Sequence, residues 1–176
     1  VAFRTRDLIV SQKIVEHILS NPGVIMNVNE LSRNWGESRI TISNYLKYLE
    51  TSLLVRSLGN FRPSSLSTSR KLRRYYPATT SLIFSRSKDI FERNMGAVLE
   101  TYVVNALQAS SYFKEGKREI DIILKDGQIL PVEVKARVEE RDLKGFSDLM
   151  SYIKARRGLM ISMGQLLRRG KIEVLP

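Results

Sequence analysis

The chain has 176 residues, 43% of them hydrophobic, which suffices for one large folded domain or two small ones. It has no cysteine and a single histidine, His17, which excludes disulfides, thiolate chemistry and histidine-rich metal sites and favours a reducing, cytoplasmic setting. The net charge is +11, and residues 1–90 hold 14 basic against 6 acidic residues, so we expect the first half to face a polyanion such as nucleic acid. We expect neither a membrane span nor a signal peptide, and the lack of an initiator Met favours a fragment of a longer protein.

The first part of the chain follows the element order of a helix-turn-helix with a wing. Apolar residues at helical spacing stop at Asn21-Pro22-Gly23 and resume further on. The predicted elements are a helix over residues 7–20, a short helix over 29–35, a turn over 36–38, an amphipathic helix over 39–54 and an alternating strand with a hairpin-type Gly59-Asn60 over 54–62. Residues 1–69 therefore resemble a winged helix-turn-helix domain.

The third predicted helix offers polar side chains for a DNA groove, because they lie off its apolar stripe or at its N-terminal end. These candidate contacts to duplex DNA are Arg39, Thr41, Asn44, Lys47 and Tyr48. The alternative is that this face, on which Ile40 is apolar, docks on a neighbouring domain or on a second copy of the chain.

Residues 63–69 are Ser-rich and predict a loop, and residues 70–77 interleave basic and aromatic side chains. Such interleaving suits a nucleic-acid backbone with stacked bases. The alternative, which we slightly favour, is a strand whose tyrosines pack at a domain boundary while its arginines reach water.

The longest predicted helix covers residues 89–108. Its expected buried stripe consists of Phe91, Met95, Val98, Leu99, Tyr102, Val103 and Ala106. Glu100 lies about 100° from Leu99 around the helix, at the border of this stripe, where it could reach a metal over the sheet. The alternative is that Glu100 is a solvated flank residue.

Residues 118–137 predict two strands joined by a turn at Asp126-Gly127, because apolar side chains alternate in both halves. Residues directly opposite in an antiparallel pair share a face, and their numbers have a constant sum. A two-residue turn would place Asp121 opposite Val132, whereas a three-residue or five-residue loop around Gly127 places it opposite Glu133. We expect the odd-length loop, since it keeps the apolar face continuous.

Two opposed carboxylates repel each other, and a hard divalent cation relieves that repulsion. Asp121 and Glu133 are therefore the candidate ligands of Mg²⁺ or Mn²⁺. Lys135 lies one pleat further along the same face, where it could hold a phosphate or orient a water molecule.

The remaining pattern predicts a first strand of this sheet near residues 111–114, a helix over 141–155 and strands over 158–163 and 171–175. No Gly-x4-Gly-Lys-Ser/Thr pattern occurs, so we expect no ATP site in this chain.

Ile120-Asp121, followed after eleven residues by Glu133-Val134-Lys135, resembles the motif of the PD-(D/E)XK nuclease superfamily. The run from about Arg70 to Lys135 resembles the nuclease-like domain of unknown function at the C-terminal end of archaeal and bacterial AAA+-type ATPases. In that family a G-x-x-x-E helix precedes the strands, and Gly96 to Glu100 matches it. Ile120 replaces the usual Pro before the Asp.

The resemblance implies an α/β (α+β) protein in which a restriction-endonuclease-like αβββαβ domain over residues 70–176 follows the winged helix. It implies a DNA-binding, metal-dependent nuclease with Asp121, Glu133, Lys135 and Glu100 at its site and an ATPase domain upstream in the intact protein. The alternative is a catalytically inactive nuclease fold that serves the ATPase as a DNA-binding or partner-binding module.

Overall fold

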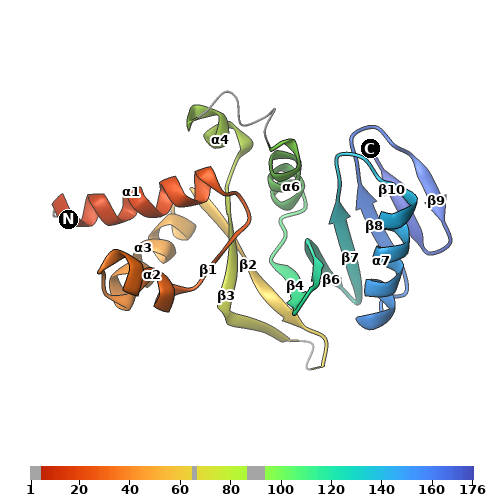
Figure 1. Ribbon diagram of the computed structural model, residues 1–176, viewed down its shortest axis with the longest axis horizontal. Helices are drawn as coiled ribbons and strands as arrows, with labels where there is room; N and C mark the ends of the chain where they lie inside the picture. Colours follow the sequence, from red (N-terminus) through yellow and green to blue (C-terminus); the bar gives the residue numbers. More distant parts are fainter. Residues whose placement is uncertain (1–4, 65–66, 87–93) are drawn as a thin grey trace.

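The protein, analysed as a computed structural model, is described over residues 5–64, 67–86 and 94–176, and it is a mixed α/β structure with two mixed sheets (Figure 1). Its helices are α1 (Thr5–Ser20), α2 (Val28–Trp35), α3 (Arg39–Thr51), α4 (Thr80–Arg86), α6 (Met95–Ala106) and α7 (Glu140–Tyr152). Its strands are β1 (Val24–Met26), β2 (Val55–Arg62), β3 (Ser67–Pro77), β4 (Ser111–Glu115), β5 (Arg118–Ile120), β6 (Ile122–Asp126), β7 (Gln128–Val134), β8 (Gly158–Ile161), β9 (Leu167–Arg169) and β10 (Ile172–Leu175). No described helix is long and apolar enough to cross a membrane.

The first three helices are confirmed to within a few residues of their predicted bounds. Asn27 and Ser38 cap α2 and α3 by accepting hydrogen bonds from backbone amides, and Gly36 ends α2 with a φ of 67°, a conformation that favours glycine. Apolar side chains of α1 and α3, among them Ile14, Ile18 and Ile42, share one buried cluster. These helices lie on one side of the β2–β3 ribbon (Figure 1).

The ribbon differs from the prediction in two places. Gly59-Asn60 is not a hairpin turn but a register shift inside the continuous strand β2, and the chain reverses only after Arg62. Residues 67–69, predicted as loop, begin β3, and the predicted domain boundary after residue 69 falls within that strand. A β-bulge shifts the register without ending the strand, so β2 and β3 stay paired on both sides of Gly59-Asn60 and no turn forms there.

The first sheet has the strand order β1-β3-β2-β4-β5, and it continues from the helical region into the second half of the chain. β3 pairs with β1 and β2 in antiparallel fashion, and β2 pairs with β4 in parallel. Tyr75 and Tyr76 point to opposite faces of β3, because Tyr75 joins the cluster of the first helices while Tyr76 packs with residues of α6. β3 is therefore covered on both faces at its tyrosines, and the expected strand with packed tyrosines is confirmed.

The second sheet has the order β6-β7-β8-β10-β9 and is covered by α7 on one face and by α6 on the other. The predicted helix over 141–155 and the strands over 158–163 and 171–175 are confirmed, whereas β1, α4 and β9 were not predicted.

In α6, Tyr102 is 62% exposed instead of buried, and Ala106 is exposed as well. Thr101 and Val104 take the buried positions, because the helix is covered by two sheets rather than one. Phe91 lies outside the described residues.

The predicted strand over 118–124 is divided at Asp121. β5 ends at Ile120 and pairs with β4 in the first sheet, while β6 starts at Ile122 and pairs with β7 in the second. Lys125 pairs with Ile129 and Leu124 with Leu130, so the odd-length loop at Gly127 is confirmed. The two sheets thus separate at Asp121, one of the two residues that the motif predicts as metal ligands.

A glycine at the start of β8 allows α7 to lie against the second sheet. A Cβ atom at Gly158 would come 2.6 Å from Met150 Sδ and 2.7 Å from Phe146 Cε1, and both side chains are buried in the core. We expect Gly158→Ala to lower the free energy of unfolding by about 1–3 kcal/mol, measured by urea denaturation. Gly145→Ala on α7 is the control, because its Cβ meets no atom and alanine favours a helix, so it should stabilise the fold by about 0.5–1 kcal/mol. A neutral Gly158→Ala would contradict this packing.

Candidate functional site

Asp121 occupies the bend between the two sheets, and its side chain is fixed by β7. Its Oδ2 accepts a hydrogen bond from the Val134 backbone amide at 2.9 Å. The paired register of β6 and β7 ends at Ile122 and Val132, so Asp121 and Glu133 lie one residue beyond the last pair. The two carboxyl groups are close enough for the charge of Asp121 to affect the titration of Glu133.

Glu133 and Lys135 lie next to each other at the end of β7. Lys135 Nζ is 3.0 Å from Glu133 Oε1, and the Lys135 backbone amide donates to the carbonyl of Ile161 on β8. The other oxygen of this carboxylate, Glu133 Oε2, is buried and has no hydrogen-bond partner among the described residues. An unpartnered buried oxygen is costly, which makes it a ready ligand for a cation.

Glu100 projects from α6 towards the same place. Its Oε1 accepts a hydrogen bond from the Tyr76 hydroxyl at 2.5 Å and lies 3.4 Å from Arg74 Nη1. The charge of Asp121 also acts on Glu100. The structure therefore brings Glu100, Asp121, Glu133 and Lys135 together, as the motif predicts.

Arg74 of β3 is the central cation of this site, and the sequence reasoning missed it. Its side chain was expected to reach water, but the residue is 6% exposed. Arg74 Nη1 lies 3.8 Å from Asp121 Oδ1 as well as near Glu100, and Nη2 forms an ion pair with Glu119. The guanidinium also lies over the Tyr112 ring at 4.8 Å from its centroid.

The sequence did contain an indication that Arg74 is buried. Alternate residues of a strand share a face, so Arg74 lies on the same face of β3 as Tyr76. That face would be buried if β3 were covered on both sides, as the tyrosines at adjacent positions indicate. The sequence does not show what covers the second face, so the carboxylates that accompany Arg74 into the interior could not be identified.

Burial and mutual repulsion raise the pKa values of the carboxyl groups in this site. Burial raises the pKa of Glu133 to about 7, and the negative charge of Asp121 adds to this effect, while Lys135 opposes it. Burial and the Asp121 charge raise the pKa of Glu100 to about 7, against the hydrogen bond from Tyr76 and the charge of Arg74. Burial raises the pKa of Asp121, although the Val134 amide and Arg74 stabilise its charged form.

A divalent cation would have to be held by few protein ligands. Within the described residues, no three His, Cys, Asp or Glu side chains are grouped as a metal site. Mg²⁺ usually takes only one or two carboxylates, with water and phosphate oxygens completing its shell. Asp121 and the unpartnered Oε2 of Glu133 fit that requirement, since both are hard oxygen ligands in a site whose carboxylates repel.

The candidate DNA contacts lie apart from this cluster, on α3. Arg39, Asn44, Lys47 and Tyr48 are exposed, and Thr41 is half-buried with its hydroxyl hydrogen-bonded to Ser38. Arg39 Nη1 donates to Asn29 Oδ1 at 3.3 Å, which orients its guanidinium on the α2–α3 surface. Ile40, which motivated the docking alternative, is 75% exposed.

We expect the raised pKa values to make stability fall as pH rises. The ordinary pKa of a glutamate is 4.5, so between about pH 4.5 and 7 the folded protein holds more protons on Glu100 and Glu133 than the unfolded chain does. The free energy of unfolding therefore decreases across this window, by an amount on the order of a few kcal/mol, at about 1.4 kcal/mol per pKa unit of each group. Urea denaturation at pH 5 and pH 8 measures it. Glu133→Gln should flatten the dependence, and a wild type equally stable at both pH values would contradict the raised pKa values.

Comparison with known families divides the chain between α4 and α6. Residues 2–88 match the family model of a domain of unknown function (DUF8612), and residues 95–176 match that of another domain of unknown function (DUF4143). The latter is found in the C-terminal region of AAA-ATPase-like proteins, which agrees with that part of the resemblance. No curated protein and no solved structure gives a significant match. The cluster of carboxylates thus lies in the region that matches DUF4143, and its cation Arg74 comes from the region that matches DUF8612.

Proposed function

We propose that this chain is the nucleic-acid-binding, metal-dependent nuclease region of an AAA-type ATPase, with a winged helix followed by a restriction-endonuclease-like domain. The observation that supports it most is the convergence of Glu100, Asp121, Glu133 and Lys135 where the two sheets separate. Four residues from three segments of the chain, each named by the motif, lie in one partly buried cluster.

The chemistry of phosphodiester hydrolysis gives each residue a role. Mg²⁺ or Mn²⁺, when bound, lowers the pKa of the attacking water and neutralises charge that develops on the leaving oxygen. Asp121 and Glu133 would hold the ion, and Glu100 would support it through a water molecule. Lys135 Nζ, 3.0 Å from Glu133, is exposed enough to place its positive charge beside the reacting phosphate.

The N-terminal half supports a winged-helix assignment through its element order. α1, α2 and α3 precede the antiparallel β2–β3 ribbon, and β1 adds to β3. In such domains the last helix enters the major groove of duplex DNA, and the face of α3 that carries Arg39, Asn44 and Lys47 is exposed.

We expect binding to duplex DNA to depend steeply on salt. A complex with about six phosphate contacts should bind on the order of 10³-fold more weakly at 200 mM salt than at 50 mM salt. Arg39→Ala and Lys47→Ala should each lower the salt slope by about 1, measured by fluorescence anisotropy. Lys13→Ala, which removes an exposed charge from α1, is the control and should change the slope little. Salt-insensitive binding would instead favour docking of this face on another domain or copy.

The position of Arg74 favours a second candidate function, a DNA-binding or partner-binding module without catalysis. The guanidinium lies among Glu100, Glu119 and Asp121 and already neutralises part of their charge. A protein that needed no metal could retain the cluster as an internal ion-pair network that joins its two halves.

Cleavage assays with branched, nicked and single-stranded substrates distinguish the two candidates. The nuclease proposal predicts that product forms with Mg²⁺ or Mn²⁺ and not with EDTA. If no substrate is cut under any metal condition while duplex binding persists, the second candidate is favoured.

A further inference from the structure

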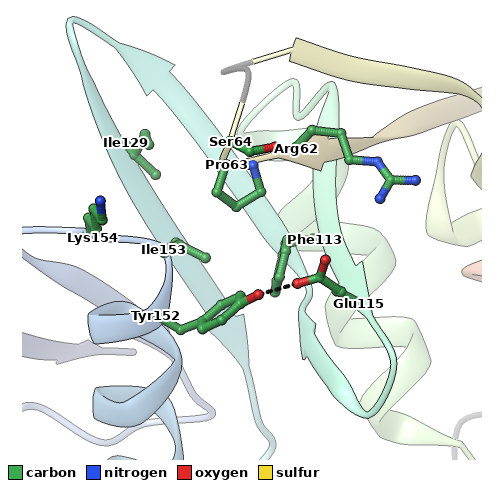
Figure 2. A pocket seen from close by; sticks show the side chains of 9 residues that line it. All are labelled: Arg62, Pro63, Ser64, Phe113, Glu115, Ile129, Tyr152, Ile153 and Lys154. Atoms are coloured by element: carbon green, nitrogen blue, oxygen red, sulfur yellow. Dashed lines mark hydrogen bonds between the residues drawn. The ribbon is translucent and has the colours of Figure 1, made fainter.

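The C-terminal end of α7 carries exposed cations on a short turn, outside the carboxylate cluster. Lys154, Arg156 and Arg157 fall within the segment that joins α7 to β8, and all three are exposed. Figure 2 shows this end of the helix, with Tyr152 directed towards Glu115 of β4 and Lys154 on the far side from that carboxylate. The turn therefore presents three positive charges together at the surface.

The backbone of this turn is fixed at both ends. The Ala155 amide donates to the carbonyl of Met150 at 2.8 Å, the bond that closes a Schellman motif after a helix. At the other end, the Gly158 amide donates to the carbonyl of Lys171 at 3.0 Å. Lys154 has a φ of 59° at the position where this motif usually has glycine. A lysine there costs stability, and strain of this kind is often retained where the side chain is used.

A fourth cation reaches this surface from β5. The Arg118 guanidinium lies over the Tyr152 ring, 4.2 Å from its centroid, and the Tyr152 hydroxyl donates to Glu115. These contacts hold the guanidinium beside the end of α7, and stacking on a ring leaves the N–H groups at the edge of a guanidinium free to bind a phosphate. We refer to Arg118 and the three cations of the turn as the α7-end surface.

The charges of the α7-end surface have no counter-charge nearby. Among the residues that the structure describes, none of these four cations forms an ion pair with a carboxylate. Five other cations of the C-terminal half do, at 3.6 Å or less: Lys114, Lys135, Arg141, Arg168 and Arg169. The helix dipole favours cations only within the last turn of α7, and Arg156 and Arg157 lie beyond it. Neither an ion pair nor the helix therefore accounts for this concentration of charge.

The chemistry of the α7-end surface fits a phosphate backbone better than a protein or a membrane. Residues 115–118 and 152–157 expose one large apolar side chain, that of Tyr152. Protein interfaces have an apolar core, and membrane-binding surfaces need several apolar side chains. Most hydrogen bonds in protein–DNA complexes instead go to phosphate and sugar, and arginine binds phosphate through two parallel N–H groups.

We propose that the α7-end surface binds the phosphate backbone of duplex DNA, as a second contact region besides α3. The two regions lie towards opposite ends of the longest axis of the protein (Figure 1), so they would contact separate stretches of one duplex or two different duplexes. The inference rests on the proposed function for its ligand class, and it requires neither metal nor cleavage.

The test measures binding to a labelled duplex by fluorescence anisotropy in EDTA, at several salt concentrations. We expect the triple variant Lys154→Ala/Arg156→Ala/Arg157→Ala to lower the salt slope by about 3, because each cation that neutralises a phosphate releases a counterion. Its affinity at about 100 mM salt should fall by at least about tenfold. An unchanged slope would overturn the proposal.

A second triple variant separates this surface from net charge. Lys13→Ala/Lys144→Ala/Lys171→Ala removes three exposed cations from α1, from the first half of α7 and from the turn before β10. It should leave the salt slope nearly unchanged. If both triple variants weaken binding equally, the total charge and not the α7-end surface determines affinity, and the proposal is overturned.

Two further measurements complete the test. Arg156→Ala/Arg157→Ala leaves the backbone turn at Lys154 intact and should still lower the slope by about 2, so the reading does not depend on the folding of the triple variant. In the Arg39→Ala/Lys47→Ala background, polyglutamate should displace the duplex far less than unlabelled duplex of equal charge does. Equal displacement would overturn the assignment to nucleic acid. Duplex binding through this surface without any cleavage in Mg²⁺ or Mn²⁺ would contradict the nuclease proposal alone.

Discussion

Replacing Arg74 by alanine is expected to lower the free energy of unfolding by about 3–5 kcal/mol at pH 8. The side chain is 8% exposed and is the cation nearest to Glu100, Glu119 and Asp121. Its removal leaves Glu100 and Asp121 largely buried without their arginine partner, whereas Glu119 keeps its ion pair with Lys114, and a buried charge without a partner is strongly destabilising. Urea denaturation measures the loss.

Three comparisons make this prediction specific. Arg73→Ala at the neighbouring position should cost less than about 1 kcal/mol, because the Arg73 side chain is 38% exposed and its pair with Glu50 spans 3.7 Å. The loss in Arg74→Ala should be smaller at pH 5.5, which lies below the raised pKa of Glu100, and it should also be smaller when Mn²⁺ is added at pH 8. If Arg74→Ala costs no more than Arg73→Ala, Arg74 does not hold the cluster together.

The second large effect is expected on cleavage. Asp121→Asn, Glu133→Gln and Lys135→Ala should each reduce the metal-dependent cleavage rate by a factor on the order of 10³ or more, which corresponds to about 4 kcal/mol of transition-state stabilisation. Asp121 and Glu133 would lose a ligand oxygen, and Lys135 the charge beside the phosphate. Affinity for duplex DNA should change little, because α3 would carry most of the binding.

Single-turnover cleavage on the preferred substrate measures these rates, and Glu139→Gln is the matched control. Glu139 is a carboxylate at the start of α7 whose ion pair with Arg141 is largely exposed. Undiminished cleavage by Asp121→Asn, purified in parallel, would assign the activity to a contaminant and not to this site.

The register of β6 and β7 was predictable because it depends only on which residues alternate between apolar and polar on either side of Gly127. The alternation of apolar residues around Gly127 and the requirement for a continuous apolar face exclude even-length loops, and the pairing of Lys125 with Ile129 follows. The same argument places Asp121 and Glu133 on one face. Local patterns of this kind depend only on neighbours along the chain.

The division of the strand at Asp121 and the burial of Arg74 were not predictable in this way. Both result from two sheets that diverge, and the residues that cover β3 come from α6 and β4, far along the chain. Tyr102 shows the same limit: helical periodicity places it on the apolar stripe, yet it is 62% exposed because a second sheet takes up Thr101 and Val104. Tertiary packing decides these positions.

Calorimetric titration with Mn²⁺ at pH 8 tests most directly whether the carboxylates at the divided strand hold a metal. The nuclease proposal predicts one site per chain in the wild type, and no binding in the Asp121→Asn/Glu133→Gln double variant, whose side chains have nearly the same size but no charge. Arg74→Gln should bind Mn²⁺ at least as tightly as the wild type, since the guanidinium competes for the same oxygens. A folded wild type that binds no Mn²⁺, even with a nucleic-acid strand present, would contradict the account and leave the cluster as an internal ion-pair network.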